Sequence, residues 1–117
     1  MVKIQIKRIY EPVELADGFR VLADRLWPRG IKKDNAGIDL WAKDITPSTA
    51  LRDDYHGGRL AWPDFEAAYR LELSTNPAFD SFVQTIKDMR TVTLLFAGKD
   101  IEHTHVKVIV EAVKQKL

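Results

Sequence analysis

The chain has 117 residues, of which 45% are hydrophobic and 30% are charged, and its formal net charge is +1. This length fits one domain over residues 1–117, and the apolar content excludes a disordered chain. A charge so close to zero does not call for a nucleic-acid partner. The absence of cysteine excludes disulfides, thiolate nucleophiles and zinc sites built on sulfur.

The N-terminal segment MVKIQIKRIY alternates polar and apolar residues and lacks the continuous apolar run of a secretory signal. No stretch of the chain approaches the length that crosses a bilayer. We therefore expect a cytoplasmic protein with no membrane partner, a location that also suits a chain without cysteine.

The first third of the chain is expected to form strands. Residues 2–9 have the period of a half-exposed strand. Asp17 and Gly18 mark a turn, and residues 19–24 are expected to form a second strand. Residues 38–45 fit either a short strand or an irregular segment.

Three helices are expected next. Ser48 suits the N-cap of the first, which Gly57 would stop. Pro63 suits the first position of the second helix, and Asn76 suits the cap of the third. The faces expected to be buried carry Trp62, Phe65, Tyr69, Leu73, Phe79, Phe82, Val83 and Ile86.

The last part of the chain has the clearest strand, TVTLLFAG at residues 91–98, whose apolar run is typical of a central strand covered on both faces. A final helix is expected from about Asp100 to Lys116. Its apolar stripe is expected to contain Val106, Ile109, Val110, Val113 and Leu117. Strands mixed with helices predict an α/β fold, a single three-layer domain with a small, mainly parallel sheet flanked by helices.

Two expected strand ends carry unusual residues. One is DRLWPRG at residues 24–30, and the other is GKD at residues 98–100. Ligands of open α/β sheets bind beyond the carboxyl ends of the strands. If these two strands are parallel neighbours, their loops meet and can form one ligand site.

The first of these loops has the composition of an anion site. Arg25 and Arg29 offer planar, bidentate donors to a phosphate or carboxylate. Trp27 offers a flat surface, Asp24 can hold one arginine in position, and Gly30 turns the backbone. The alternative is a structural Asp–Arg pair, with the tryptophan closing the edge of the core.

In the second loop, Gly98 allows close approach of the backbone to a ligand and Lys99 adds a positive charge. A helix that begins here would present free N–H groups to an anion. Asp100 is a candidate ligand residue, and its alternative role is the N-cap of that helix. The spaced glycines of a P-loop are missing.

His103 and His105 lie two residues apart, which places their side chains about 200° apart on a helix. They cannot bind one ion if both are helical, so no metal site is expected. One of them is expected to face the cleft as an acid, a base or an anion ligand. His56 is expected simply to end a helix.

Nucleic acid is not an expected partner. Residues 1–33 do carry eight Lys and Arg against four Asp and Glu. However, the chain contains no recognition motif, and its aromatic residues do not alternate with the basic ones.

The segments DGFRVLADRLWPRG, ITPSTALR and TLLFAGKDIEHTH, in this order, resemble the YeaO-like family of small bacterial proteins, a domain family of unknown function numbered 488. The resemblance covers essentially the whole chain and implies a single α/β domain without an established activity. The residues that the family shares map here onto Asp24, Arg25, Trp27, Pro28, Arg29, Gly30, Pro47, Ser48, Leu51, Arg52, Lys99 and His105.

More distant members of the family carry cysteines, in patterns such as C-A-x-K-D and H-C-H-R. Phe96 and Thr104 stand at these positions here. The chain keeps the two imidazoles of the second pattern, His103 and His105, and lacks both thiols. A cysteine-dependent mechanism is therefore not expected of it.

We therefore predict an anion pocket built from Arg25, Arg29, Lys99 and His105, with Ser48 and Arg52 as further members. The ligand would be a small phosphorylated or carboxylated compound, for example a nucleotide stacked on the loop tryptophan, and no cofactor is expected. In an enzyme, the catalytic candidates are His105, His103 and Asp24. The same pocket would equally serve a non-catalytic binding or regulatory module, and the sequence leaves both open.

Overall fold

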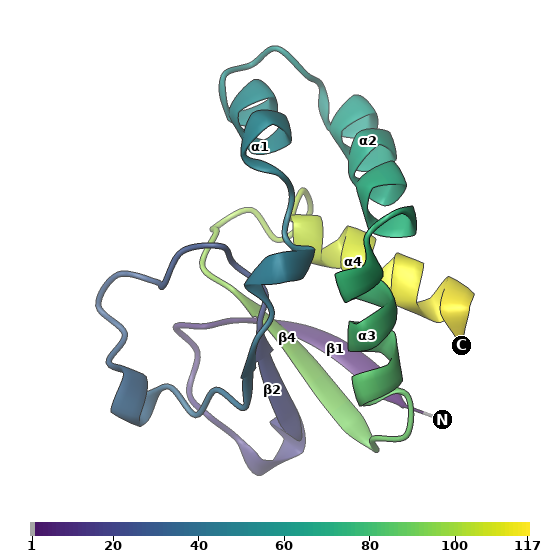
Figure 1. Cartoon of the computed structure of the whole chain (residues 1–117). Coiled ribbons are helices and arrows are strands. Elements are labelled where there is room, and N and C mark those ends of the chain that lie inside the picture. Colours follow the sequence, from purple (N-terminus) through teal and green to yellow (C-terminus); the bar gives the residue numbers. More distant parts are fainter. Residues whose placement is uncertain (1) are drawn as a thin grey trace.

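A parallel four-stranded sheet forms the centre of the computed structural model, which describes residues 2–117 (Figure 1). Its strands are β1 (Lys3–Arg8), β2 (Phe19–Leu22), β3 (Leu40–Trp41) and β4 (Thr91–Phe96), in the order β1-β4-β2-β3. The apolar β4 lies between β1 and β2 and is buried on both faces, as its composition predicts.

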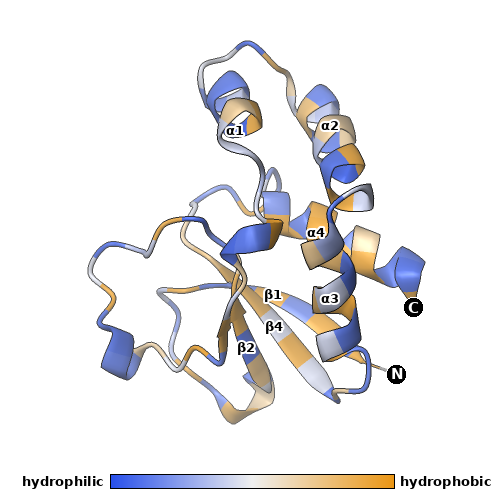
Figure 2. Cartoon of the chain, viewed as in Figure 1, coloured by the Kyte–Doolittle hydropathy of each residue, from blue (hydrophilic) through white to orange (hydrophobic). Residues whose placement is uncertain are grey.

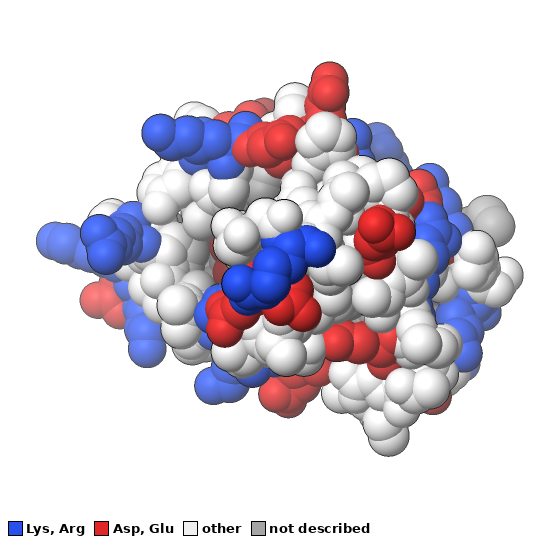
Figure 3. Space-filling view, turned by 90° about the horizontal axis from the view of Figure 1, so that it is seen from above, with Lys and Arg blue, Asp and Glu red and all other residues white. Residues whose placement is uncertain are grey.

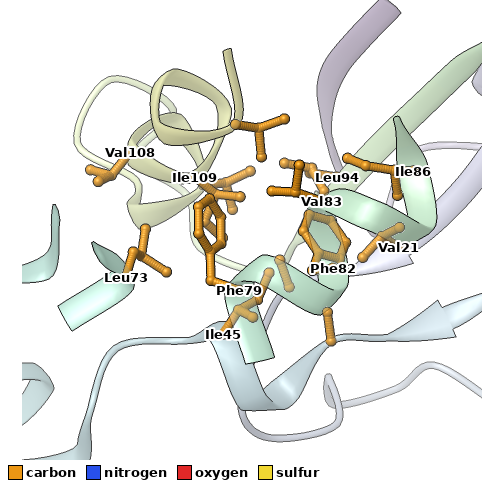
Figure 4. Packing of buried hydrophobic residues seen from close by; sticks show 14 of the residues in the cluster. Val21, Ile45, Leu73, Phe79, Phe82, Val83, Ile86, Leu94, Val108 and Ile109 are labelled. Atoms are coloured by element: carbon orange, nitrogen blue, oxygen red, sulfur yellow. The ribbon is translucent and has the colours of Figure 1, made fainter. Parts of the chain in front are cut away.

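Helices α3 (Pro77–Ile86) and α4 (His105–Lys116) pack on one face of this sheet. Helices α1 (Thr49–His56) and α2 (Trp62–Ser74) stand beyond the strand ends, where α2 packs against α4 (Figure 1). Side chains alternate across a strand, so Leu94 and its neighbours two residues away point toward the helices. Figure 4 shows Phe79 of α3 next to Ile109 of α4, and Phe82 of α3 on the side of Val21 and Leu94 of the sheet. In Figure 2, β1 alternates between the orange of apolar and the blue of polar residues, whereas β4 contains no blue segment.

The other face of the sheet is covered by the chain connections. Leu22 and Leu95 pack there in a smaller cluster with Ile9, against the partly buried Trp27 and Trp41. These connections contain only short 3-10 turns, at Leu15–Asp17 and Lys33–Asn35. The second covering layer therefore contains no α-helix, because prolines and glycines interrupt both segments.

The predicted single α/β domain with a parallel sheet is confirmed. Residues 38–45, left open by the sequence, form β3 and the 3-10 turn Lys43–Ile45. Leu117, expected in the apolar stripe of the last helix, is 45% exposed, while Val108 is fully buried. Within residues 2–117 no helix combines the length and apolarity needed to cross a membrane.

The last helix begins later than the sequence suggested. We expected it to start near Asp100, but α4 starts at His105, with Thr104 as its N-cap. The hydroxyl of Thr104 accepts a hydrogen bond from the N–H of Val106 at 3.4 Å. Residues 97–104 are an irregular loop, because Asp100 holds a tight turn of its own.

Candidate functional site

A cleft of about 620 Å³ opens where β2 and β4 end. Its walls come from three places: the loop after β2, the loop after β4, and the helices α1 and α2 with the segment before them. In Figure 1 the strands end near the middle of the molecule, and α1 and α2 stand above them. The cleft thus occupies the position where ligands bind to open α/β sheets.

The two strand loops meet because β2 and β4 are parallel neighbours, with Leu22 opposite Leu95. The N–H of Ala23 extends this pairing by donating to the carbonyl of Leu95 at 2.9 Å. Beyond that point Asp24 joins the loops, since its Oδ2 accepts from the N–H of Ala97 at 2.8 Å. The carboxylate of Asp24 is 17% exposed and lies on the cleft wall.

His105, the first residue of α4, completes this part of the wall. Its Nε2 donates a hydrogen bond to the carbonyl of Ala23 and lies 3.6 Å from Oδ1 of Asp24. A carbonyl oxygen can only accept, so Nε2 carries the proton and Nδ1 is the acceptor in the neutral ring. No residue within 2–117 donates to Nδ1, and the ring is 21% exposed.

Burial shifts both titrating groups toward their neutral forms. Desolvation raises the pKa of Asp24, against the opposing effects of His105 and of the hydrogen bond from Ala97. Desolvation likewise lowers the pKa of His105, although the Ala23 carbonyl and Asp24 act in the other direction. The imidazole is therefore neutral at neutral pH and presents one acceptor nitrogen.

Four basic side chains line the same cleft: Arg25, Arg29, Arg52 and Lys99. Arg25 donates to the carbonyl of Pro47 at 3.2 Å and lies 3.5 Å from the hydroxyl of Thr49. None of the four pairs with a carboxylate in the described part of the chain. Figure 3, a view from above, shows Lys and Arg at several places on this side of the molecule, interspersed with Asp and Glu.

The wall opposite the strand loops is aromatic. Tyr55 at the end of α1 lies 4.6 Å, centroid to centroid, from Phe65 of α2. Trp62 stacks on Phe65 at 5.4 Å and lies 5.3 Å from the ring of His103. We predicted Trp62 and Phe65 only as core residues and did not foresee Tyr55, because these rings come together only when α1 and α2 fold against each other.

Trp27 lines the cleft, but its polar atom and part of its ring are already engaged. Its indole N–H donates to the carbonyl of Ile31 at 2.7 Å. Its ring meets Trp41 edge-on at 5.3 Å and lies 5.5 Å from the ammonium of Lys33. These contacts hold the loop against the connection-covered face of the sheet, as the structural alternative for this residue supposed.

Two candidate residues lie outside the cleft. Gly30, at φ 79°, lines a separate hollow near Tyr10. Ser48 caps α1, and its hydroxyl donates to Glu72 of α2 at 2.6 Å. Both residues therefore have a structural role in this fold, and the sequence alone did not distinguish that role from contact with a ligand.

Asp100 lines the cleft mouth without capping a long helix. Its Oδ1 accepts from the N–H groups of Glu102 and His103 at 3.0 and 3.1 Å, and Oδ2 lies 3.2 Å from Nδ1 of His103. These backbone hydrogen bonds lower the pKa of Asp100. Because Asp100 occupies these N–H groups, this loop does not offer the helix-end anion site that we expected beside Gly98 and Lys99.

Within residues 2–117, no group of three or more His, Asp and Glu residues is arranged to hold an ion. His103 and His105 both reach the cleft, but His103 pairs with Asp100 while His105 bonds to Ala23. The two imidazoles therefore serve different partners.

A small α/β domain with a basic and aromatic cleft at its strand ends is the class of protein that this geometry defines. The chain belongs to the family described as the inactive DUF488-N3 subclade, whose model matches residues 3–117. This agrees with the YeaO-like resemblance of its three sequence segments.

Two relatives illustrate this membership. The uncharacterized protein YeaO of Escherichia coli (strain K12) is 40% identical over 110 residues, which cover 94% of this chain and 96% of YeaO. The uncharacterized protein Rv3073c of Mycobacterium tuberculosis is 32% identical over 109 residues, which cover 93% and 92% of the two chains. No solved structure matches the chain.

Proposed function

We propose that the protein is a non-catalytic binding module that holds a small phosphorylated or carboxylated compound in the cleft. The observation that carries the proposal is the set of four cleft-lining cations that pair with no carboxylate among residues 2–117. Three of them, Arg29, Arg52 and Lys99, also make no side-chain hydrogen bond in this part of the chain. An anion would supply these missing partners.

Two further observations favour binding over catalysis. The chain has no cysteine, and its family is described as inactive. We also propose the cytoplasm as its location, because a chain without cysteine suits a reducing compartment.

The test uses Arg29, which is exposed and whose side chain has no partner among the residues that the structure describes. We expect Arg29→Lys to bind ribose 5-phosphate about tenfold more weakly, because the variant keeps the charge and loses the bidentate fork. Arg29→Ala should bind more weakly still, and added salt should weaken binding to the wild type. Isothermal titration calorimetry measures these affinities.

The matched control is Arg90→Lys, at an arginine that is also exposed and lies outside the cleft. This variant should bind as the wild type does. The free energy of unfolding of Arg29→Lys should stay within about 0.5 kcal/mol of the wild-type value, as is usual for a surface substitution. If Arg29→Lys unfolds the protein, the loop is a structural clamp and the anion site is wrong.

The second candidate is an enzyme, favoured by the closeness of Asp24 and His105 beside the cations. His105 would act as acid or base, and the arginines would stabilise developing negative charge. Turnover of a panel of phosphate esters by the pure protein, lost in His105→Ala, would support the enzyme. Saturable binding without turnover would support the module.

A further inference from the structure

We propose that the ligand has two parts: a flat nitrogen heterocycle that donates an N–H to Asp24 and His105, and an anionic group held by the arginines. The chemical class is a nucleoside monophosphate. The inference rests on the proposed anion-binding function and goes further, since it names the uncharged part of the ligand and its partners.

The first step concerns the acceptors beside the strand ends. Nε2 of His105 is occupied by the Ala23 carbonyl, so Nδ1 of the neutral ring can only accept a hydrogen bond. Oδ2 of Asp24 is occupied by the N–H of Ala97, and Oδ1 lies 3.6 Å from the imidazole, too far for a hydrogen bond. This part of the cleft therefore offers two acceptors, both within one short stretch of wall.

The second step concerns charge. A phosphate beside the Asp24 carboxylate would be repelled by its negative charge. An N–H donor would instead give both acceptors a hydrogen-bond partner. The anion therefore belongs nearer the basic residues Arg25, Arg29 and Arg52. A ligand that satisfies both regions at once must carry a donor at one end and a negative charge at the other.

The third step concerns shape. Tyr55 and Trp62 are half-buried and line the cleft beside the ring of His103, so the three rings form an aromatic border to the cleft. A planar heterocycle can stack on an aromatic ring that borders the cleft, whatever the identity of the base. The cleft volume of about 620 Å³ lies within the range of roughly 300–1,000 Å³ that accommodates ligands of this size.

The experiment compares four probes by isothermal titration calorimetry with the full chain: guanosine 5′-monophosphate, purine riboside 5′-monophosphate, ribose 5-phosphate and inorganic phosphate. Guanine presents adjacent N–H donors, and unsubstituted purine presents none. We expect the guanosine nucleotide to bind at least tenfold more tightly than either the purine nucleotide or ribose 5-phosphate.

Variants of the cleft residues test where the heterocycle of the ligand binds. Trp62→Leu should weaken binding of the guanosine nucleotide about tenfold and leave binding of ribose 5-phosphate unchanged. Trp62→Phe should keep most of the wild-type affinity for the nucleotide. Asp24→Asn should reduce the preference for guanine over purine. Melting temperatures measured in parallel verify that each variant is folded.

Equal affinity for all phosphate probes would overturn the two-part ligand while leaving the anion site intact. Equal affinity for the guanosine and purine nucleotides would overturn the role of Asp24 and His105 as acceptors for the base. Failure of every probe to bind would overturn both this inference and the anion-binding function on which it rests.

Discussion

The side chain of His105 connects the protonation state of the protein to its stability. The folded pKa lies below the ordinary value of 6.5, and desolvation by burial is the largest cause. The unfolded chain therefore takes up this proton first as the pH falls. Protonation thus favours the unfolded state, and stability decreases between pH 6.5 and the lower folded pKa.

We expect the free energy of unfolding to fall as the pH is lowered from about 7.5 to about 5.5, the range in which histidines titrate. His105→Gln should show a smaller decrease over the same range. Urea denaturation at each pH measures this, and equal slopes for the two proteins would mean that another group is responsible. Asp24 acts in the opposite sense, since its raised pKa makes the folded state the stronger proton acceptor.

At the scale of elements, Ser48 joins two helices. Its Oγ accepts from the N–H of Leu51 at 3.2 Å and donates to Glu72 at 2.6 Å, and its N–H donates to Glu72 at 2.9 Å. The residue thus caps α1 and fixes it against α2. This position explains why a serine at a helix start, which we predicted as a possible ligand residue, lies outside the cleft.

Ser48→Ala should destabilise the protein by about 1 kcal/mol, the usual cost of losing an N-cap, and should leave phosphate binding unchanged. The control is Ser81→Ala on the exposed side of α3, which should have almost no effect. Thermal denaturation and titration with ribose 5-phosphate measure the two properties. A loss of binding without a loss of stability would place Ser48 in the ligand site after all.

The central strand β4 supplies a second test at this scale. Leu95 is fully buried and packs on the connection-covered face. Leu95→Ala should cost about 2–5 kcal/mol, the range for buried leucine truncation. Leu71→Ala, at a residue that is 67% exposed on α2, should stay within about 0.5 kcal/mol. A loss below about 1 kcal/mol at Leu95 would contradict a central position for the strand.

At the scale of the whole molecule, a buried polar network attaches the connections to the sheet. Asp17 is 3% exposed and pairs with both Lys7 of β1 and Arg20 of β2. Its carbonyl accepts from the hydroxyl of Thr93 in β4 at 2.6 Å. Arg20 continues the network by donating to the carbonyl of Ala36 at 3.1 Å. The network thus ties together three strands and two connections.

Asp17→Asn should destabilise the protein by about 3–5 kcal/mol, because it leaves the buried guanidinium of Arg20 without its counter-charge. The control is Asp54→Asn, at an exposed pair with Arg59, which should cost less than about 1 kcal/mol. Urea denaturation measures both. Burial by itself would raise the pKa of Asp17, but its hydrogen bonds lower it below 3.8. Its stabilisation is therefore present above pH 3.8 and is lost as the pH falls through the folded pKa.

Local patterns predicted most of the elements. The caps at Ser48 and Asn76 and the apolar run of β4 depend on neighbouring residues only, and the structure has them where we expected them. The predicted start of α4 near Asp100 was wrong, because Asp100 caps a separate turn through the N–H groups of Glu102 and His103. Sequence spacing does not distinguish these two uses of an aspartate.

The candidate site, too, has features that local sequence predicted and features that depend on the tertiary structure. The sequence by itself determined that Arg25 and Lys99 follow strands, because an apolar run and its ending are local properties. Only the tertiary structure decided that these strands are adjacent, that Tyr55 and Trp62 form the opposite wall, and that Trp27 is engaged by Trp41. The physical reason is that contacts between distant segments depend on strand order and helix packing, which become favourable only when the whole core is buried.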